Sequence, residues 1–293
     1  LLYTAIVFPI MTTLPKILEY HEFSYFFIGI ILAFFQFGST CLMFLFTKFS
    51  FKGEYLKYVY FSLSLSIVLF YFFIENHYLS VLFAFIIALS YLLGMGYNDM
   101  MIVEKYKEKQ GRVRALGSFF FVIIAISSYY LNVDEIFIFN FLVVGSIFLF
   151  INSLQLKKLS AYQKNILIKK EHFFNELMLY THFFVFFIGI GMFASFYTLI
   201  MLQNGHSLAD TFLFFATFIG GEVIGLYFFD RVLNFSRFFT IKNIIWFSLL
   251  MTIFRFLFMD LYITSFYWQL LLNLLHLFTF AFMYSSIVVY FNL

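Results

Sequence analysis

Long apolar runs follow one another along almost the whole chain of 293 residues, separated by short charged or turn-forming stretches. A helix needs about 20 apolar residues to cross the hydrocarbon core of a bilayer, so each run of that length predicts one membrane-spanning helix. Ten runs meet this requirement: residues 2–18, 24–47, 56–74, 79–100, 114–132, 136–154, 174–202, 208–229, 243–260 and 266–290. The pattern therefore predicts an all-α, polytopic membrane protein.

The composition agrees with this prediction and excludes other classes of protein. Hydrophobic residues make up 63% of the chain and charged residues only 11%, whereas a soluble domain carries about 25% charged residues. The formal net charge of +3 therefore gives no reason to expect a nucleic-acid partner. With Cys41 as its one cysteine, the chain cannot form an internal disulfide or a cysteine metal site, and no feature calls for a metal or an organic cofactor.

Lys and Arg residues gather in alternate connections between the predicted helices. All but two of the 18 lie in the segments 48–57, 104–114, 157–170 and 230–242, which share one side of the membrane when the ten spans are drawn. Basic connections stay in the cytoplasm under the positive-inside rule, so we expect the N-terminus to be cytoplasmic as well. The two exceptions are Lys16, at the end of the first run, and Arg255, within the ninth.

The longest basic connection follows the sixth run and predicts a division of the chain. We expect an N-terminal six-helix bundle at residues 1–154, a cytoplasmic central loop at 155–172 and a C-terminal bundle at 173–293 with four helices present. The chain begins without Met and ends with the tenth run, so we interpret it as a fragment or a trimmed chain. Pro9 and Pro15 in the first run argue against a cleaved signal peptide.

Few ionisable residues lie within the predicted spans, and four of them stand out. Asp99 ends the fourth run, Glu222 lies in the eighth, Arg255 in the ninth and His276 in the tenth. An ionisable group at membrane depth costs several kcal/mol unless it is paired or hydrated, so each of the four is a candidate functional residue.

A polar stripe surrounds the histidine of the tenth run. Asn273 comes three residues before His276 and Thr279 three residues after it. Residues three apart share one face of a helix, so the three side chains form one stripe on an otherwise apolar helix. We expect the stripe to face a cavity rather than lipid, and we include Asn273 in the candidate substrate site.

Glu222, Arg255 and His276 lie on three consecutive predicted helices and suggest a buried charge cluster. We expect Glu222 and Arg255 to neutralise one another, so that a proton arriving at Glu222 or His276 breaks this balance. Such a change in the pairing of a fixed cation is the physical requirement for proton coupling. Two simpler interpretations stay open: the pair merely ties two helices together, and His276 is an interhelical hydrogen-bonding residue.

A second candidate site lies at the start of the fifth run. Arg112 and Arg114 are two residues apart and diverge by about 200° on a helix, so one can stay in the loop while the other faces the interior. Arg114 beside Asp99 suits a carboxylate ligand, because the planar guanidinium binds carboxylates with two hydrogen bonds. The alternative is that both arginines are ordinary anchors at the cytoplasmic surface.

Pairs of small residues recur in several of the predicted spans. They are Gly38 and Ser39, Gly94 and Gly96, Gly189 and Gly191, and Gly220 and Gly221. Small residues allow membrane helices to approach closely and to slide, although static packing explains them equally well.

Four segments together resemble a known family. Gly111-Arg112-Val113-Arg114-Ala115-Leu116-Gly117-Ser118 is similar to the signature that opens the fifth helix of major facilitator transporters of the 3-phenylpropionate transporter type. The other three segments resemble the family's eighth, ninth and tenth helices, in that order: Gly220-Gly221-Glu222-Val223, Phe254-Arg255-Phe256 and Leu275-His276-Leu277-Phe278-Thr279-Phe280.

The resemblance implies a major facilitator fold of two six-helix bundles with a central cavity, of which about ten of the expected twelve helices are present. It also implies that Asp99 and Arg114 bind substrate, and that Glu222, Arg255, His276 and Thr279 form the proton-coupling network. The related oligosaccharide:proton symporters of the lactose permease group carry a glutamate where this chain has Thr279, which moves the prediction away from sugars. The chain also lacks the family's G-x-x-x-D-[RK] motif between helices two and three.

Our leading hypothesis is a monomeric, proton-coupled secondary transporter of the bacterial inner membrane. Its expected partners are protons, the lipid bilayer and a small organic anion such as an aromatic carboxylate. A nucleoside or sugar proton symporter of the same fold and a degenerate, non-transporting relative are the alternatives. A membrane-embedded enzyme is disfavoured, because the chain contains neither H-E-x-x-H nor G-x-S-x-G and its predicted external loops are short.

Overall fold

The computed structural model describes residues 10, 12–35, 56–106, 110–154, 193–194, 196–235 and 240–286, without the side chains of residues 95–97, 99–106, 110, 230, 234 and 235. Every regular element within these ranges is a helix. The labelled helices are α2 (Leu14–Tyr20), α4 (Leu56–Phe72), α5 (His77–Tyr106), α6 (Gln110–Leu131), α7 (Glu135–Ser153), α9 (Leu208–Phe235), α10 (Ile241–Leu261) and α11 (Phe266–Leu274). A π-helical turn, η4 (Leu277–Ala281), follows α11, and two further helices occupy residues 25–35 and 196–203.

Six of the ten predicted spans coincide with these helices, the span at 266–290 does so as far as residue 286, and the spans at 2–18, 24–47 and 174–202 also extend beyond the described residues. Six helices in the described part are long and apolar enough to cross a membrane, and the helices at 25–35 and 56–72 are shorter but also apolar. The prediction of an all-helical protein is confirmed for this part of the chain, and its long apolar helices are consistent with a polytopic membrane protein. Apolar side chains such as Trp246, Leu250 and Leu257 are exposed along one face of α10, as expected of a surface that contacts lipid.

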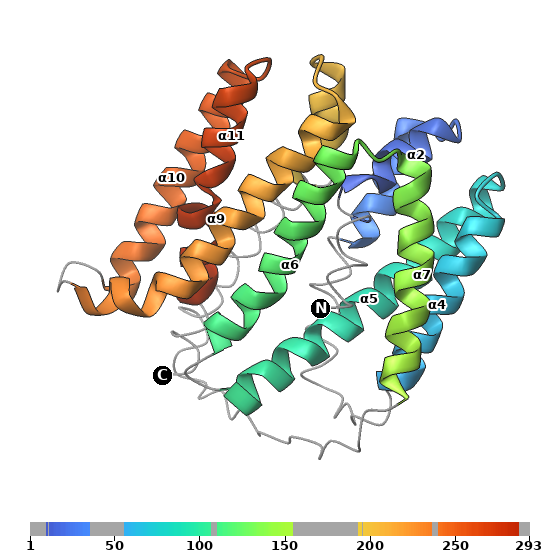
Figure 1. Cartoon of the computed structure of the whole chain (residues 1–293), viewed down its shortest axis with the longest axis horizontal. Coiled ribbons are helices and arrows are strands. Elements are labelled where there is room, and N and C mark those ends of the chain that lie inside the picture. Colours follow the sequence, from blue (N-terminus) through green and yellow to red (C-terminus); the bar gives the residue numbers. More distant parts are fainter. Residues whose placement is uncertain are drawn as a thin grey trace, which may run out of the picture.

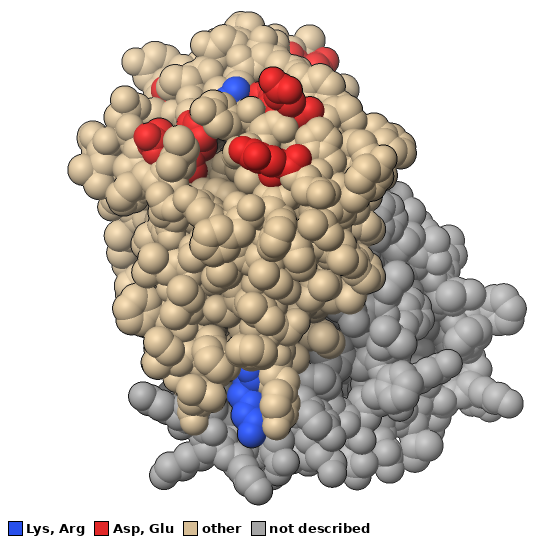
Figure 2. All heavy atoms as spheres, turned by 90° about the vertical axis from the view of Figure 1, so that its right-hand side faces the viewer, with Lys and Arg blue, Asp and Glu red and all other residues tan. Residues whose placement is uncertain are grey.

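Successive helices run in opposite directions, so their short connecting turns lie together at the upper end of Figure 1. We call this the acidic end, because most of the described acids lie in or beside these turns: Glu19, Glu22, Glu75, Asp134, Glu135, Asp210 and Asp260. Figure 2 shows Asp and Glu gathered at that end. Lys57, Arg112, Arg231 and Lys242 lie at the opposite ends of their helices. Charge is thus divided between the two ends of the molecule.

Two large hydrophobic clusters fill the interior. The first is built mainly from α2, the helix at 25–35, α4, α5 and α7, with Leu199 added from the helix at 196–203. The second is built from the helix at 196–203, α9, α10 and α11, and it also includes Phe121 and Ala125 of α6. Helix α6 therefore packs along α9, beside which it lies in Figure 1. We call the part before residue 155 the first half and the part from residue 193 the second half; the predicted loop at 155–172 lies outside the described residues.

Two glycines of α9 allow the last described span, which contains α11 and η4, to approach α9 closely. A Cβ atom at Gly221 would lie 2.6 Å from the carbonyl oxygen of Leu274, and one at Gly225 would lie 2.5 Å from the Cβ of Ala281. Gly220 has nothing within 4 Å of its Cβ position. Of the predicted glycine pair Gly220 and Gly221, only Gly221 makes a close helix contact, and Gly225 one turn later makes another.

Candidate functional site

Arg255 lies on the buried face of α10, with only 1% of its surface exposed. Its Nη1 donates to Nδ1 of His276 (3.1 Å) and to Oγ1 of Thr279 (3.3 Å), while its Nη2 donates to Oδ1 of Asn273 (3.0 Å). The Nε atom has no hydrogen-bond partner. All three acceptors are neutral, so a permanent cation lies at membrane depth with no acid among the described residues within ion-pair distance.

The predicted polar stripe supplies these acceptors. Asn273, His276 and Thr279 are all buried and all reach Arg255. The stripe therefore faces the protein interior rather than lipid, as predicted, but where a cavity was expected it contacts Arg255 and aromatic rings. Helix α11 ends at Leu274, and His276 and Thr279 lie at and within the π-helical turn that follows. Such widened turns re-aim side chains and occur frequently at functional sites.

A chain of buried hydrogen bonds leads from Arg255 to the acidic end of α10. Asn273, which accepts from Arg255, donates through Nδ2 to the Tyr197 hydroxyl (2.7 Å). That hydroxyl donates to Oε1 of Gln269 (3.3 Å), whose Nε2 donates to the carbonyl oxygens of Met259 and Tyr262 (3.1 Å each).

Every donor in this chain points away from the cation. The chain ends on carbonyls of the last turn and C-cap of α10, where the helix dipole carries a negative partial charge. Hydrogen bonds aligned in this way polarise one another and spread the positive charge over several residues. The chain thus stabilises Arg255 without a carboxylate.

The expected ion pair between Glu222 and Arg255 is not formed, and this prediction is wrong for the observed structure. Glu222 is also buried, on α9, but its Oε1 accepts a hydrogen bond from the Ser118 hydroxyl of α6 at 3.0 Å. Arg255 turns instead toward the stripe on the next span. The physical reason is that α9 presents Phe218, one turn before Glu222, to the guanidinium, whose carbon lies 4.9 Å from the centroid of that ring.

Four rings form a column beside this cluster. Phe218 stacks on His276 with centroids 3.6 Å apart, His276 on Phe280 at 4.9 Å, and Phe280 on Tyr284 at 5.9 Å, with interplanar angles below 20°. Arg255 lies against the Phe218 ring at one end of the column. At the other end the guanidinium of Arg114 lies 4.0 Å from the Tyr284 centroid. We call this arrangement the ring column.

The two arginines at the start of α6 diverge as predicted. Arg112 is exposed and lies 5.7 Å from the Tyr227 ring, whereas Arg114 is half-buried and donates from Nη1 to the Tyr284 hydroxyl. Arg114 therefore joins the first half to the last described span of the second half. Its predicted neighbour Asp99 belongs to α5, but the Asp99 side chain lies outside the described part, so their pairing stays a prediction.

Several site residues escaped the sequence analysis. Gln269 lies four residues before Asn273, so the same helical periodicity that indicated the stripe was available to extend it. Tyr197, Phe218, Phe280 and Tyr284 carried no such signal, since the chain contains 21 Tyr and 51 Phe.

The arrangement combines two sequence-distant arginines, a stack of rings and a buried carboxylate between the halves. Guanidinium groups bind carboxylates, and aromatic faces bind flat apolar rings. Among the described residues, no group of three His, Cys, Asp or Glu side chains is arranged to hold a metal ion. No family model matches this chain, and no curated protein matches it.

Proposed function

We propose that this protein is a proton-coupled secondary transporter of the major facilitator type that carries a small organic anion, in particular an aromatic carboxylate. The observation that carries the proposal is the ring column with an arginine at each end. An aromatic acid needs a flat apolar surface for its ring and a fixed cation for its carboxylate, and Tyr284 and Arg114 offer both within 4.0 Å.

The Arg114 site is suited to an exchange of partners. Arg114 donates to the neutral hydroxyl of Tyr284, and hydrogen bonds to a carboxylate are stronger than those to a neutral oxygen. A substrate carboxylate replacing that hydroxyl would therefore be favoured, while the substrate ring packs against the half-buried Tyr284 ring.

Proton coupling is assigned to Glu222. Its carboxylate lies between α6 of the first half and α9 of the second, held by Ser118. Protonation removes the charge and weakens that contact, which links the protonation state to the fit between the halves. Arg255 keeps its charge through neutral partners and the hydrogen-bond chain, so it supplies a fixed positive potential in the second half.

In this proposal the protein acts as a monomer in a bacterial inner membrane. The end opposite the acidic end, where Lys57, Arg112, Arg231 and Lys242 lie, and the N-terminus face the cytoplasm, in accordance with the positive-inside rule. The halves rock about the α6 and α9 contact to expose the site alternately to each side, as in other transporters built from repeated bundles.

Uptake by proteoliposomes tests the proposal. Purified protein is reconstituted, an inward proton gradient is imposed and the uptake of radiolabelled 3-phenylpropionate is followed, with an ionophore that collapses the gradient as the control. Gradient-dependent accumulation supports the proposal. If the acid is not taken up but a nucleoside or a sugar is, the fold assignment survives and the substrate class is wrong. Failure with all three classes rejects the transport function.

A further inference from the structure

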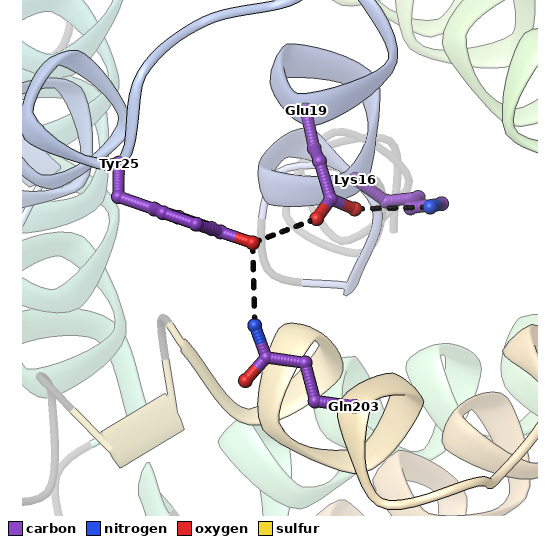
Figure 3. Close-up of polar contacts among 4 residues, drawn as sticks. All are labelled: Lys16, Glu19, Tyr25 and Gln203. Carbon is purple, nitrogen blue, oxygen red and sulfur yellow. Dashed lines mark hydrogen bonds and ion pairs between the residues drawn. The ribbon is translucent and has the colours of Figure 1, made fainter.

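A group of polar contacts at the acidic end joins three separate helices (Figure 3). The Tyr25 hydroxyl lies between two partners: it donates to Oε1 of Glu19 at 3.1 Å and accepts from Nε2 of Gln203 at 3.3 Å. The other oxygen of Glu19 forms an ion pair with Lys16 at 3.0 Å. Figure 3 shows these side chains converging from different helices, with the Tyr25 hydroxyl at the meeting point.

The contacts cross the boundary between the halves. Lys16 and Glu19 belong to α2 and Tyr25 to the helix at 25–35, both in the first half, whereas Gln203 ends the helix at 196–203 in the second half. The same helix approaches the first half again one to two turns deeper. There the buried Thr198 hydroxyl donates to the carbonyl oxygen of Thr12 at 2.6 Å, and Leu199 packs into the first hydrophobic cluster.

These two levels differ in strength. The deeper contact is buried, so breaking it leaves a polar group without water as a substitute. The outer contacts are exposed, and water replaces them when they part. The bridge from Glu19 through Tyr25 to Gln203 is exposed, and Lys16 holds the Glu19 carboxylate in place. These contacts therefore form and break at a low cost in free energy.

We propose that Tyr25, held by Glu19 and engaged by Gln203, is a latch that closes the acidic end of the boundary between the halves and must open whenever the site is exposed on that side. The proposal rests on alternating access as proposed above for its role in transport. The closure of the boundary at the acidic end does not depend on transport, so it can be measured without any substrate.

The experiment measures the separation of the two halves at the acidic end. Cys41 is replaced by Ser, and single cysteines are placed at Phe72 and Leu261, exposed positions at the ends of α4 and α10, for spin labels. Electron–electron distance measurements on the reconstituted protein compare the parent with Tyr25→Phe, which removes only the bridging hydroxyl. The matched control is Tyr267→Phe, because Tyr267 is 81% exposed and its hydroxyl makes no hydrogen bond within the described residues.

We expect Tyr25→Phe to raise the population with a longer distance by roughly fivefold, the size expected for the loss of one or two exposed hydrogen bonds. Tyr267→Phe should leave the distribution unchanged. Gln203→Leu should give the same shift as Tyr25→Phe, and the double variant no more than either, since both break one bridge. Identical distributions in Tyr25→Phe and the parent would overturn the latch.

Transport of the same variants separates the two proposals. A shifted distance in a protein that transports nothing supports the latch and counts against the proposed function. An unchanged distance together with normal 3-phenylpropionate uptake overturns the latch and supports the proposed function.

Discussion

The Nδ1 atom of His276 accepts a hydrogen bond from Nη1 of Arg255 across 3.1 Å. A guanidinium has only donors, so Nδ1 of His276 carries no proton and the ring is neutral, with its proton on Nε2. Protonating Nδ1 would set two donors and two positive charges against each other in a buried site. In the observed conformation His276 therefore positions Arg255 and closes the stack between Phe218 and Phe280, and Glu222 is the better candidate to accept the transported proton.

Glu222→Gln tests that assignment. The amide keeps the size of the side chain and still accepts from Ser118, but it cannot ionise. We expect gradient-driven accumulation to be abolished while exchange of labelled for unlabelled substrate across the membrane is retained. Both rates are measured in proteoliposomes, and equal loss of the two would show that Glu222 does not couple protons to transport.

Arg114→Lys examines the carboxylate site. Lysine keeps the charge but loses the planar fork and the stacking on Tyr284, so uptake at low substrate concentration should fall by roughly tenfold or more. Arg112→Lys is the matched control, because Arg112 is exposed on the same turn and should tolerate the change. Similar uptake rates in the two variants would mean that Arg114 is an ordinary anchor at the cytoplasmic surface and not part of a carboxylate site.

Gln269→Leu interrupts the hydrogen-bond chain between Arg255 and the end of α10. The change leaves the Tyr197 hydroxyl and the Met259 and Tyr262 carbonyls with fewer partners, so we expect a loss of roughly 1–3 kcal/mol of stability. The midpoint of thermal unfolding in detergent reports this loss. Leu271→Ala, at an exposed apolar position on the same helix, serves as the matched control, because it changes a surface side chain without removing a hydrogen bond. An unchanged midpoint in Gln269→Leu would mean that the chain does not stabilise the buried cation.

Gly225→Ala tests the close approach of α9 to the π-helical turn. The added Cβ would meet the Cβ of Ala281 at 2.5 Å, and overpacking of this kind typically costs about 1–3 kcal/mol. Gly220→Ala adds the same atom where nothing lies within 4 Å, so it should leave the unfolding midpoint unchanged or raise it slightly. The contact would be in doubt if the two variants unfolded at the same temperature.

Prediction from the sequence succeeded where the signal was local. Six of the predicted spans coincide with observed helices, and a seventh does so as far as residue 286, because a helix of about 20 consecutive apolar residues satisfies its own backbone within a membrane. The stripe of Asn273, His276 and Thr279 was also predictable, since residues three apart on one helix share a face regardless of the rest of the fold. The division of charge between the two ends followed from the same pattern.

The choice of partners between helices was not predictable in this way. The sequence places Glu222 and Arg255 on neighbouring spans, but Phe218 and Glu222 share one face of α9, so the depth at which each lies decides that Phe218 meets Arg255 and that Glu222 meets Ser118. The ring column and the Tyr25 bridge likewise join residues from different helices. Their positions in the sequence do not indicate that they are in contact. The sequence by itself determined which segments enter the membrane and which faces are polar, because both depend on neighbours along the chain. Only the tertiary structure decided which polar groups meet, because that depends on how closely whole helices approach one another and at which depth their side chains lie.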